Sequence, residues 1–161
     1  MAVTANRVWR QLSNEVRVSA SEVFWAKPAS GQKQLITTAI AKAKSVREIS
    51  VRRAPVERLV NWTAATLTLP DAIVNSLLQE FLLHQHRAVI VNFLDSLAIP
   101  NSDAMIEEGF DVTSLPKERI QDAARTLLTS TDRPGAELYL KFLVIQGEPW
   151  SVIEEVLPVG E

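Results

Sequence analysis

Apolar residues recur every three or four positions along most of the chain, which is the spacing of one face of an α-helix. One such stripe covers residues 4–27, is interrupted at residues 28–31, and is followed by a second over residues 30–51. The pattern predicts two helices packed as an antiparallel hairpin. A third helix is predicted to open at Pro55, because proline fits the first turn of a helix.

Residues 69–147 contain a possible internal repeat with a spacing of 46 residues. The Leu-Pro pair at 69–70 recurs at 115–116, and the apolar stripes that follow the two pairs have almost the same positions. In the second copy the stripe ends in Ser-Thr-Asp-Arg-Pro-Gly at residues 130–135, a turn followed by a helix start. The aligned residues 84–87 are therefore also predicted to form a turn, which divides residues 70–99 into two antiparallel helices.

These patterns predict an all-α fold of about eight helices, since no strand-like alternation and no hairpin-forming dipeptide occurs. A helix pair of this length is found both in HEAT and armadillo-like stacks and in ordinary bundles, and both architectures stay open. We expect one compact domain with an N-terminal helical hairpin, two helix-pair units, a connector between them and a short capping helix. The hairpin comprises residues 1–54. The two helix-pair units are residues 69–100 and 115–147, within a region 55–161. The connector is residues 100–115, and the capping helix is residues 150–157.

Composition adds an asymmetry of charge to an otherwise ordinary soluble sequence. The 161 residues are 47% hydrophobic and 22% charged, with a net charge of −2. Residues 1–69 carry 11 Lys and Arg against 4 Asp and Glu, a net of +7, whereas residues 70–161 carry 6 against 15, a net of −9. The basic and acidic parts are expected to attract each other, within a monomer or across a symmetric dimer.

Several classes of chemistry find no support in the sequence. The chain has no cysteine, which excludes disulfides, thiolate metal sites and a cysteine nucleophile. Neither a signal peptide nor a membrane span is recognisable, so a cytoplasmic protein is expected. Phosphate-binding loops, dinucleotide fingerprints and nucleophile elbows are also missing, and no catalytic residue or cofactor is predicted.

Two groups of side chains are weak candidates for metal binding. Glu80, His84 and His86 would need a turn to bring both histidines to one ion, because residues two apart point to opposite sides of a helix. No third histidine is present elsewhere, so solvated turn histidines are the preferred interpretation. An acidic cluster within the connector lacks the spacing of an EF-hand loop and is expected to be solvated; its members are Asp103, Glu107, Glu108 and Asp111.

Two surfaces are candidates for binding macromolecules. The aromatic and apolar residues Trp9, Leu12, Val16, Trp25 and Trp62 are predicted to form an association surface, or else to pack on the chain's own core. A second set could contact a polyanion, and its members are Lys44, Arg47, Arg52 and Arg53. Nucleic acid is disfavoured, because the acidic part would repel it and no recognition motif is present.

The sequence thus favours a non-catalytic interaction or scaffold protein that self-associates, most simply as a homodimer. One alternative is a helical small-molecule-binding protein or enzyme with a site in the bundle interior. Another alternative is a nucleic-acid-associated protein that uses the basic hairpin.

Overall fold

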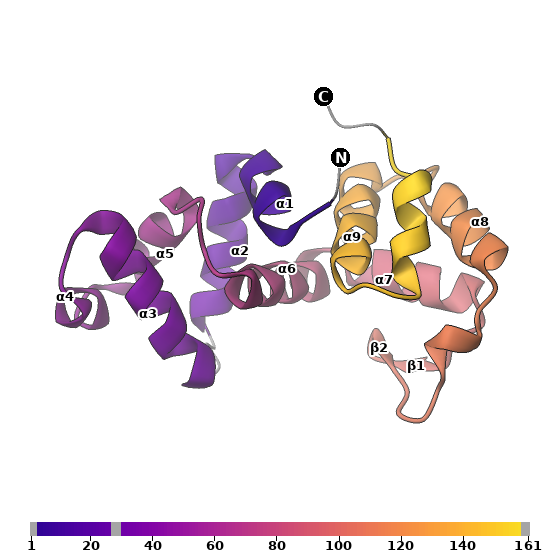
Figure 1. Ribbon diagram of the computed structural model, residues 1–161, viewed down its shortest axis with the longest axis horizontal. Coiled ribbons are helices and arrows are strands. Elements are labelled where there is room, and N and C mark those ends of the chain that lie inside the picture. Colours follow the sequence, from indigo (N-terminus) through magenta and orange to yellow (C-terminus); the bar gives the residue numbers. More distant parts are fainter. Residues whose placement is uncertain (1–2, 27–29, 159–161) are drawn as a thin grey trace. The chain divides into compact units, whose positions relative to one another are not determined.

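The computed structural model describes residues 3–26 and 30–158 (Figure 1). Almost all of the regular elements in these residues are helices, which confirms the all-α prediction. In chain order the elements, with η for a 3-10 helix, are α1 (Ala5–Gln11), α2 (Asn14–Ala26), α3 (Ser30–Lys44), α4 (Glu48–Arg52), α5 (Val56–Ala65), α6 (Asp71–Gln85), α7 (Arg87–Ser96), β1 (Asn101–Ser102), β2 (Met105–Ile106), η1 (Val112–Ser114), α8 (Lys117–Leu127), α9 (Arg133–Ile145) and η2 (Trp150–Glu155).

The elements divide into two compact units. One unit covers residues 4–81, and the other runs from Leu82 onward and includes Val3. The division lies inside α6. The division into an N-terminal hairpin, residues 1–54, and a repeat region, residues 55–161, is based on charge and repeat spacing and stays a prediction.

The first predicted helix is two helices in the structure. Leu12 has extended backbone angles, with φ −68° and ψ 148°, and the hydroxyl of Ser13 accepts a hydrogen bond of 3.2 Å from the backbone NH of Val16. A serine in this position caps the start of a helix, here α2. The most extensive partner of α2 is α5, which lies outside the predicted hairpin. The guanidinium of Arg17 adds a hydrogen bond of 2.9 Å from α2 to the carbonyl of Ala64 at the end of α5.

The second predicted helix is likewise divided, at Ser45. This residue has a left-handed backbone with φ 55°, and the NH of Val46 bonds the carbonyl of Ala41 at 3.0 Å. That bond and the one from Ser45 N to Lys42 O form a Schellman motif, in which glycine is the usual residue. The chain therefore turns after α3 and forms the short helix α4, which the buried side chain of Val51 anchors.

The predicted division of residues 70–99 into two helices is confirmed, because α6 ends at Gln85 and α7 begins at Arg87. The antiparallel packing predicted for these two helices stays a prediction. The starts of α7 and α9, at Arg87 and Arg133, are 46 residues apart, and so are the starts of α6 and α8, at Asp71 and Lys117. Five buried positions from α7 to its C-cap also have buried counterparts 46 residues later. The pairs are Val89 and Gly135, Ile90 and Ala136, Phe93 and Tyr139, Leu94 and Leu140, and Leu97 and Leu143.

Three aromatic rings form the centre of the unit that begins at Leu82. The rings of Phe93 on α7 and Tyr139 on α9 meet edge to face with centroids 5.6 Å apart, and Trp150 at the start of η2 lies 6.0 Å from Phe93. Gln121 on α8 is buried and donates a hydrogen bond of 2.9 Å to the carbonyl of Val152, which ties η2 to α8. The core of this unit thus joins α7, α8, α9 and η2.

The connector contains a feature that the sequence analysis excluded, a two-stranded antiparallel sheet. Asn101 pairs with Ile106 and Ser102 pairs with Met105. The two residues between the strands, Asp103 and Ala104, both have positive φ angles, of 54° and 66°. This is the geometry of a type I′ hairpin turn, which usually contains Asn-Gly or Asp-Gly. With alanine in the second position, the turn has no recognisable signature in the sequence.

Tyr139, the only tyrosine of the chain, gives a spectroscopic test of the core of the unit that begins at Leu82. Burial raises the pKa of the Tyr139 phenol well above its ordinary value. The unfolded chain ionises its tyrosine at about pH 10, whereas the folded chain keeps it neutral. The free energy of unfolding is therefore unaffected by this group below about pH 10 and falls as the pH rises further. In an alkaline titration we expect phenolate absorbance to appear only together with the loss of helical circular dichroism. A phenolate signal with a midpoint near pH 10 in a fully helical protein would contradict this burial.

Candidate functional site

Two of the five residues predicted to form an association surface lie in the core instead. Trp9 is 0% exposed and its indole NH donates a hydrogen bond of 3.0 Å to the carbonyl of Thr66. Trp25 is buried as well, and its NH donates to the hydroxyl of Thr63 at 2.9 Å. Because both rings are enclosed and their polar atoms are paired within the fold, the predicted association surface must be corrected for these two residues. They match the alternative interpretation, packing on the chain's own core.

The other three residues of that set are partly accessible. Leu12 and Val16 are half-buried around the junction of α1 and α2. Trp62 is half-buried on α5, and the guanidinium of Arg58 lies over its ring at 5.9 Å from the ring centroid. Such a stack contributes about 0.5–1 kcal/mol at an accessible position. The structure therefore does not bring the five predicted residues together on one exposed face.

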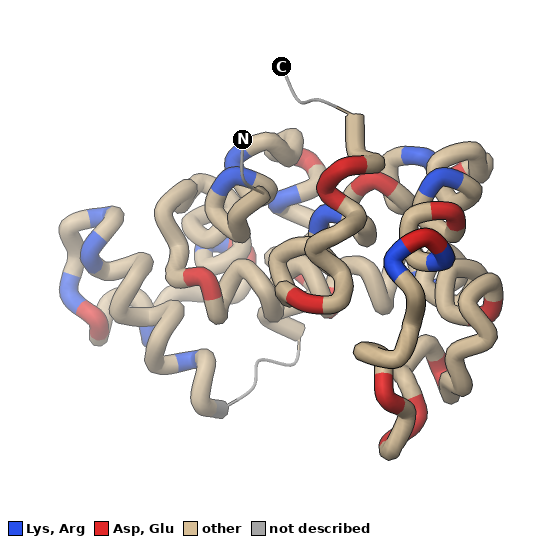
Figure 2. Tube along the Cα trace, turned by 45° about the vertical axis from the view of Figure 1, so that its right-hand side comes forward, with Lys and Arg blue, Asp and Glu red and all other residues tan. Residues whose placement is uncertain are grey.

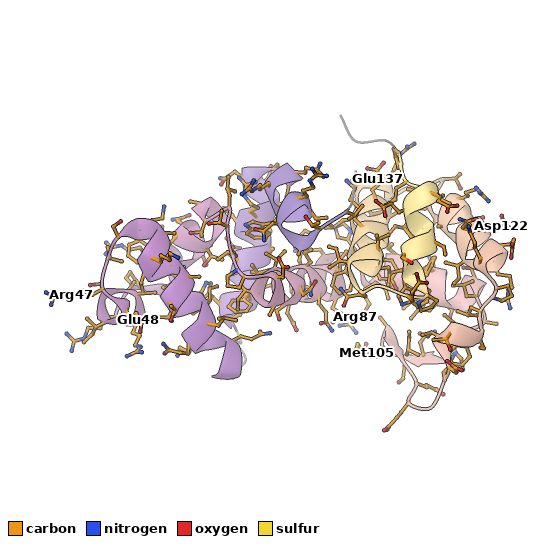
Figure 3. All side chains as sticks on the ribbon, viewed as in Figure 1. Arg47, Glu48, Arg87, Met105, Asp122 and Glu137 are labelled. Carbon is orange, nitrogen blue, oxygen red and sulfur yellow. The ribbon has the colours of Figure 1, made fainter. Side chains whose placement is uncertain are left out.

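The predicted polyanion-contacting residues lie close together around α4. Lys44 is the last residue of α3, Arg47 is the N-cap of α4, and Arg52 and Arg53 end that helix. All four side chains are exposed. Figure 2 shows Lys and Arg in blue gathered around α4, and Figure 3 shows that Arg47 extends away from the helices.

Most of these charges have no neutralising partner. The side chains of Lys44, Arg47 and Arg53 make no hydrogen bond or ion pair within the part of the chain that the structure describes. Residues 42–58 carry six Lys and Arg against two Asp and Glu, a net of +4. The charge is therefore directed at solvent rather than used inside the fold.

Arg52 has a different role, because it belongs to a polar network that fixes α4 against α3. Its guanidinium donates to the side-chain carbonyl of Gln34 at 2.9 Å and lies 3.4 Å from the carboxylate of Glu48. The same carboxylate accepts a hydrogen bond of 2.9 Å from the hydroxyl of Thr38. Since these residues join two helices, the network holds the backbone of α4, which carries the neighbouring cations, against α3.

Apolar side chains are exposed among the same cations, and the sequence analysis did not single them out. Val56 is 58% exposed and Ile49 is 48% exposed, and Val46 is exposed beside them in the chain. Exposed apolar residues that occur singly are normal, so these three are notable only because they lie within eleven positions of one basic segment. We refer to this set as the basic surface; it consists of Lys42, Lys44, Val46, Arg47, Ile49, Arg52, Arg53, Val56 and Arg58.

The β1–β2 hairpin is a second exposed feature with mixed chemistry. Met105 is 52% exposed and Ile106 is also exposed, and the acidic Glu107 and Glu108 follow directly. The turn is fixed to α7, because the guanidinium of Arg87 bonds the carbonyl of Asp103 at 3.1 Å and also its carboxylate. Figure 3 shows Arg87 and Met105 in the same region of the fold.

The candidate metal ligands do not form a metal site. Glu80 and His84 are exposed on α6, whereas the imidazole Nδ1 of His86 lies 2.5 Å from the carboxylate of Asp132. Across residues 3–26 and 30–158, no three His, Asp or Glu side chains gather closely enough to hold an ion. The Asp132 carboxylate also accepts a hydrogen bond of 3.1 Å from the NH of Gly135, so it caps α9 while it holds His86.

Comparison with known proteins leaves the chain without a family assignment. A search against protein-family models found no match, and neither the curated proteins nor the solved structures contain a significant match. Among the residues that the structure describes, no helix combines the length and the apolar character needed to cross a membrane.

Proposed function

We propose that this chain is a non-catalytic interaction protein that binds an acidic, partly apolar polypeptide segment on the basic surface. The observation that carries the proposal is the presence of unpaired cations and exposed aliphatic side chains on one rigid part of the fold. Unpaired cations attract an acidic partner and orient it. The exposed aliphatic side chains supply area whose burial stabilises the complex, by about 25 cal/mol per Å².

The polar network between α3 and α4 supports this proposal. Because Gln34, Glu48 and Arg52 are already bonded to one another, α4 does not have to be ordered when a partner binds. A binding surface that is rigid before association loses less conformational freedom.

The matched helix starts, and the matched buried positions of α7 and α9, support a related proposal, that residues 69–100 and 115–147 are two copies of one repeat. Each copy begins with Leu-Pro, and the spacing of 46 residues holds for both helices of the pair. Helix-pair units are common frameworks for protein interaction. This argument is one of architecture and adds nothing about the partner.

Two defined probes separate a polypeptide partner from a nucleic acid. One is a synthetic peptide that alternates glutamate and leucine, and the other is a DNA duplex of the same total charge. We expect tighter binding of the peptide in fluorescence anisotropy. The double variant Ile49→Ser/Val56→Ser is expected to weaken peptide binding about tenfold, which corresponds to about 1.4 kcal/mol of lost apolar contact.

The matched control is Leu67→Ser, which removes an exposed aliphatic side chain outside the basic surface and is expected to leave the affinity unchanged. The variant Arg47→Ala/Arg53→Ala should weaken binding of both probes, because it removes charge alone. The proposal would be refuted, and a polyanion favoured, if DNA binds more tightly than the peptide and Ile49→Ser/Val56→Ser leaves the affinity for the peptide unchanged.

A further inference from the structure

The β1–β2 hairpin is acidic and partly apolar, which are the properties proposed for a segment that binds the basic surface. Residues 101–111 contain four Asp and Glu and no Lys or Arg, a net of −4, whereas residues 42–58 have a net of +4. Both segments also expose large aliphatic side chains, Met105 and Ile106 on the hairpin and Ile49 and Val56 on the basic surface. One chain therefore carries two surfaces that are complementary in charge and alike in exposed apolar area.

The hairpin is held in one conformation. Besides the bonds from Arg87 to Asp103, the side-chain amide of Asn101 donates to the carboxylate of Asp95 at 3.0 Å, which fixes β1 to α7. The NH of Glu107 closes the hairpin on the carbonyl of Pro100 at 2.9 Å. These contacts leave residues 105–108 displayed on a backbone that does not need to be ordered upon binding.

The carboxylates of Glu107 and Glu108 are available for a partner. Both residues are exposed, and neither side chain makes a hydrogen bond or ion pair with any residue within 3–26 or 30–158. Asp103 differs, because its carboxylate is paired with Arg87. The two glutamates are thus the counterpart of the unpaired Lys44, Arg47 and Arg53 on the basic surface.

We propose that residues 105–108 of one copy of this chain bind the basic surface of a second copy. Glu107 and Glu108 pair with the cations beside α4, and Met105 and Ile106 pack against Ile49 and Val56. This inference rests on the proposed function and names its partner. A closed dimer, in which each copy gives its hairpin to the other, would occupy all four surfaces.

Sedimentation equilibrium of the full chain over a concentration series tests this pairing. We expect reversible association that weakens as salt rises, since exposed charges are screened beyond about 8–10 Å. The variants Arg47→Glu/Arg53→Glu and Glu107→Lys/Glu108→Lys should each weaken association by about tenfold or more. In the chain that carries all four changes, positions 47 and 53 are acidic and positions 107 and 108 are basic. The two segments attract each other again, so this chain should associate.

The matched control is Arg125→Glu/Arg133→Glu. It alters the net charge as much as Arg47→Glu/Arg53→Glu does, at two exposed positions of α8 and α9, and we expect it to retain association. Failure of the four-residue exchange to restore association would overturn the pairing. So would an equal loss of association in the control.

Other outcomes separate the two proposals. A wild-type chain that is monomeric throughout but binds the glutamate-leucine peptide would remove the second copy as partner and leave the proposed function standing. A monomer that also fails to bind the peptide would remove both. If the double variants instead lower the stability of a monomer, and the four-residue exchange restores it, the contact forms within one chain and the inference is wrong.

Discussion

Replacing Trp9 with alanine is expected to lower the free energy of unfolding by about 3–5 kcal/mol, the largest effect of any substitution considered for this chain. The ring is fully buried, and its NH is bonded to the carbonyl of Thr66. Truncation leaves a cavity the size of an indole and removes the hydrogen-bond donor of the Thr66 carbonyl. Urea unfolding followed by circular dichroism measures the loss.

Two further variants divide this effect into its parts. Trp9→Phe keeps an aromatic ring in the core and removes the hydrogen bond and part of the ring volume, so a loss of about 1–3 kcal/mol is expected. Trp62→Ala is the matched control, because that ring is half-buried and stacks on Arg58 at 5.9 Å, and its loss should be clearly smaller than that of Trp9→Ala. Equal losses at the two tryptophans would mean that Trp9 is not a core residue.

Replacing Gly135 with alanine is expected to destabilise the fold by about 1–3 kcal/mol, although alanine favours a helix over glycine by about 1 kcal/mol. A Cβ at this position in the first turn of α9 would lie 2.3 Å from Nδ1 of His86 and 2.6 Å from the carboxylate of Asp132. The clash involves the imidazole ring itself, which the contact with Asp132 holds in place.

A second substitution identifies the cause. In the background His86→Ala, most of the obstruction is gone, so the further change Gly135→Ala should become neutral or stabilising. Gly31→Ala is the control, since Gly31 also lies in the first turn of a helix but no atom surrounds its Cβ position within 4 Å. Thermal unfolding of the single and double variants measures the interaction energy. A destabilisation by Gly135→Ala that persists without His86 would exclude this explanation.

Helix starts were predictable where a residue has a strong local preference. Pro55, Pro70 and Pro116 each stand directly before a helix, because proline is compatible with the first turn and with no later one. The turn at residues 84–87 has no proline or glycine, and it was predictable only by comparison with residues 130–133.

The breaks within the N-terminal helices were harder to predict for two different reasons. Ser13 is a recognisable N-cap in the sequence, but the apolar stripe runs through it and dominated the interpretation. Ser45 gives no such signal, because a left-handed C-cap usually requires glycine. The hairpin at Asp103 and Ala104 was missed for the same reason, since alanine in that turn position is contrary to local preference.

The candidate site was predictable as a charge pattern and not as a surface. The cluster of Lys44, Arg47 and Arg53 followed from counting charges along the chain. The role of Trp9 could not follow from spacing, because an aromatic stripe has the same periodicity whether it faces a partner or the core. Exposure of Ile49 and Val56 depends on which helices cover α4 and α5, which is a matter of tertiary packing.

The left-handed residues of this fold have a consequence for the energetics of recognition. Ser45 lies in the chain between Lys44 and Val46 of the basic surface, and Asp103 and Ala104 form the turn of the hairpin. Each non-glycine residue in this conformation costs about 1–2 kcal/mol in the folded state, and the surrounding contacts compensate for it. If these segments bind as proposed, their loop shapes are already formed in the free protein, and the entropy of binding should be governed by released water and ions rather than by ordering of the backbone. A calorimetric titration would then show little of the unfavourable entropy that accompanies folding upon binding.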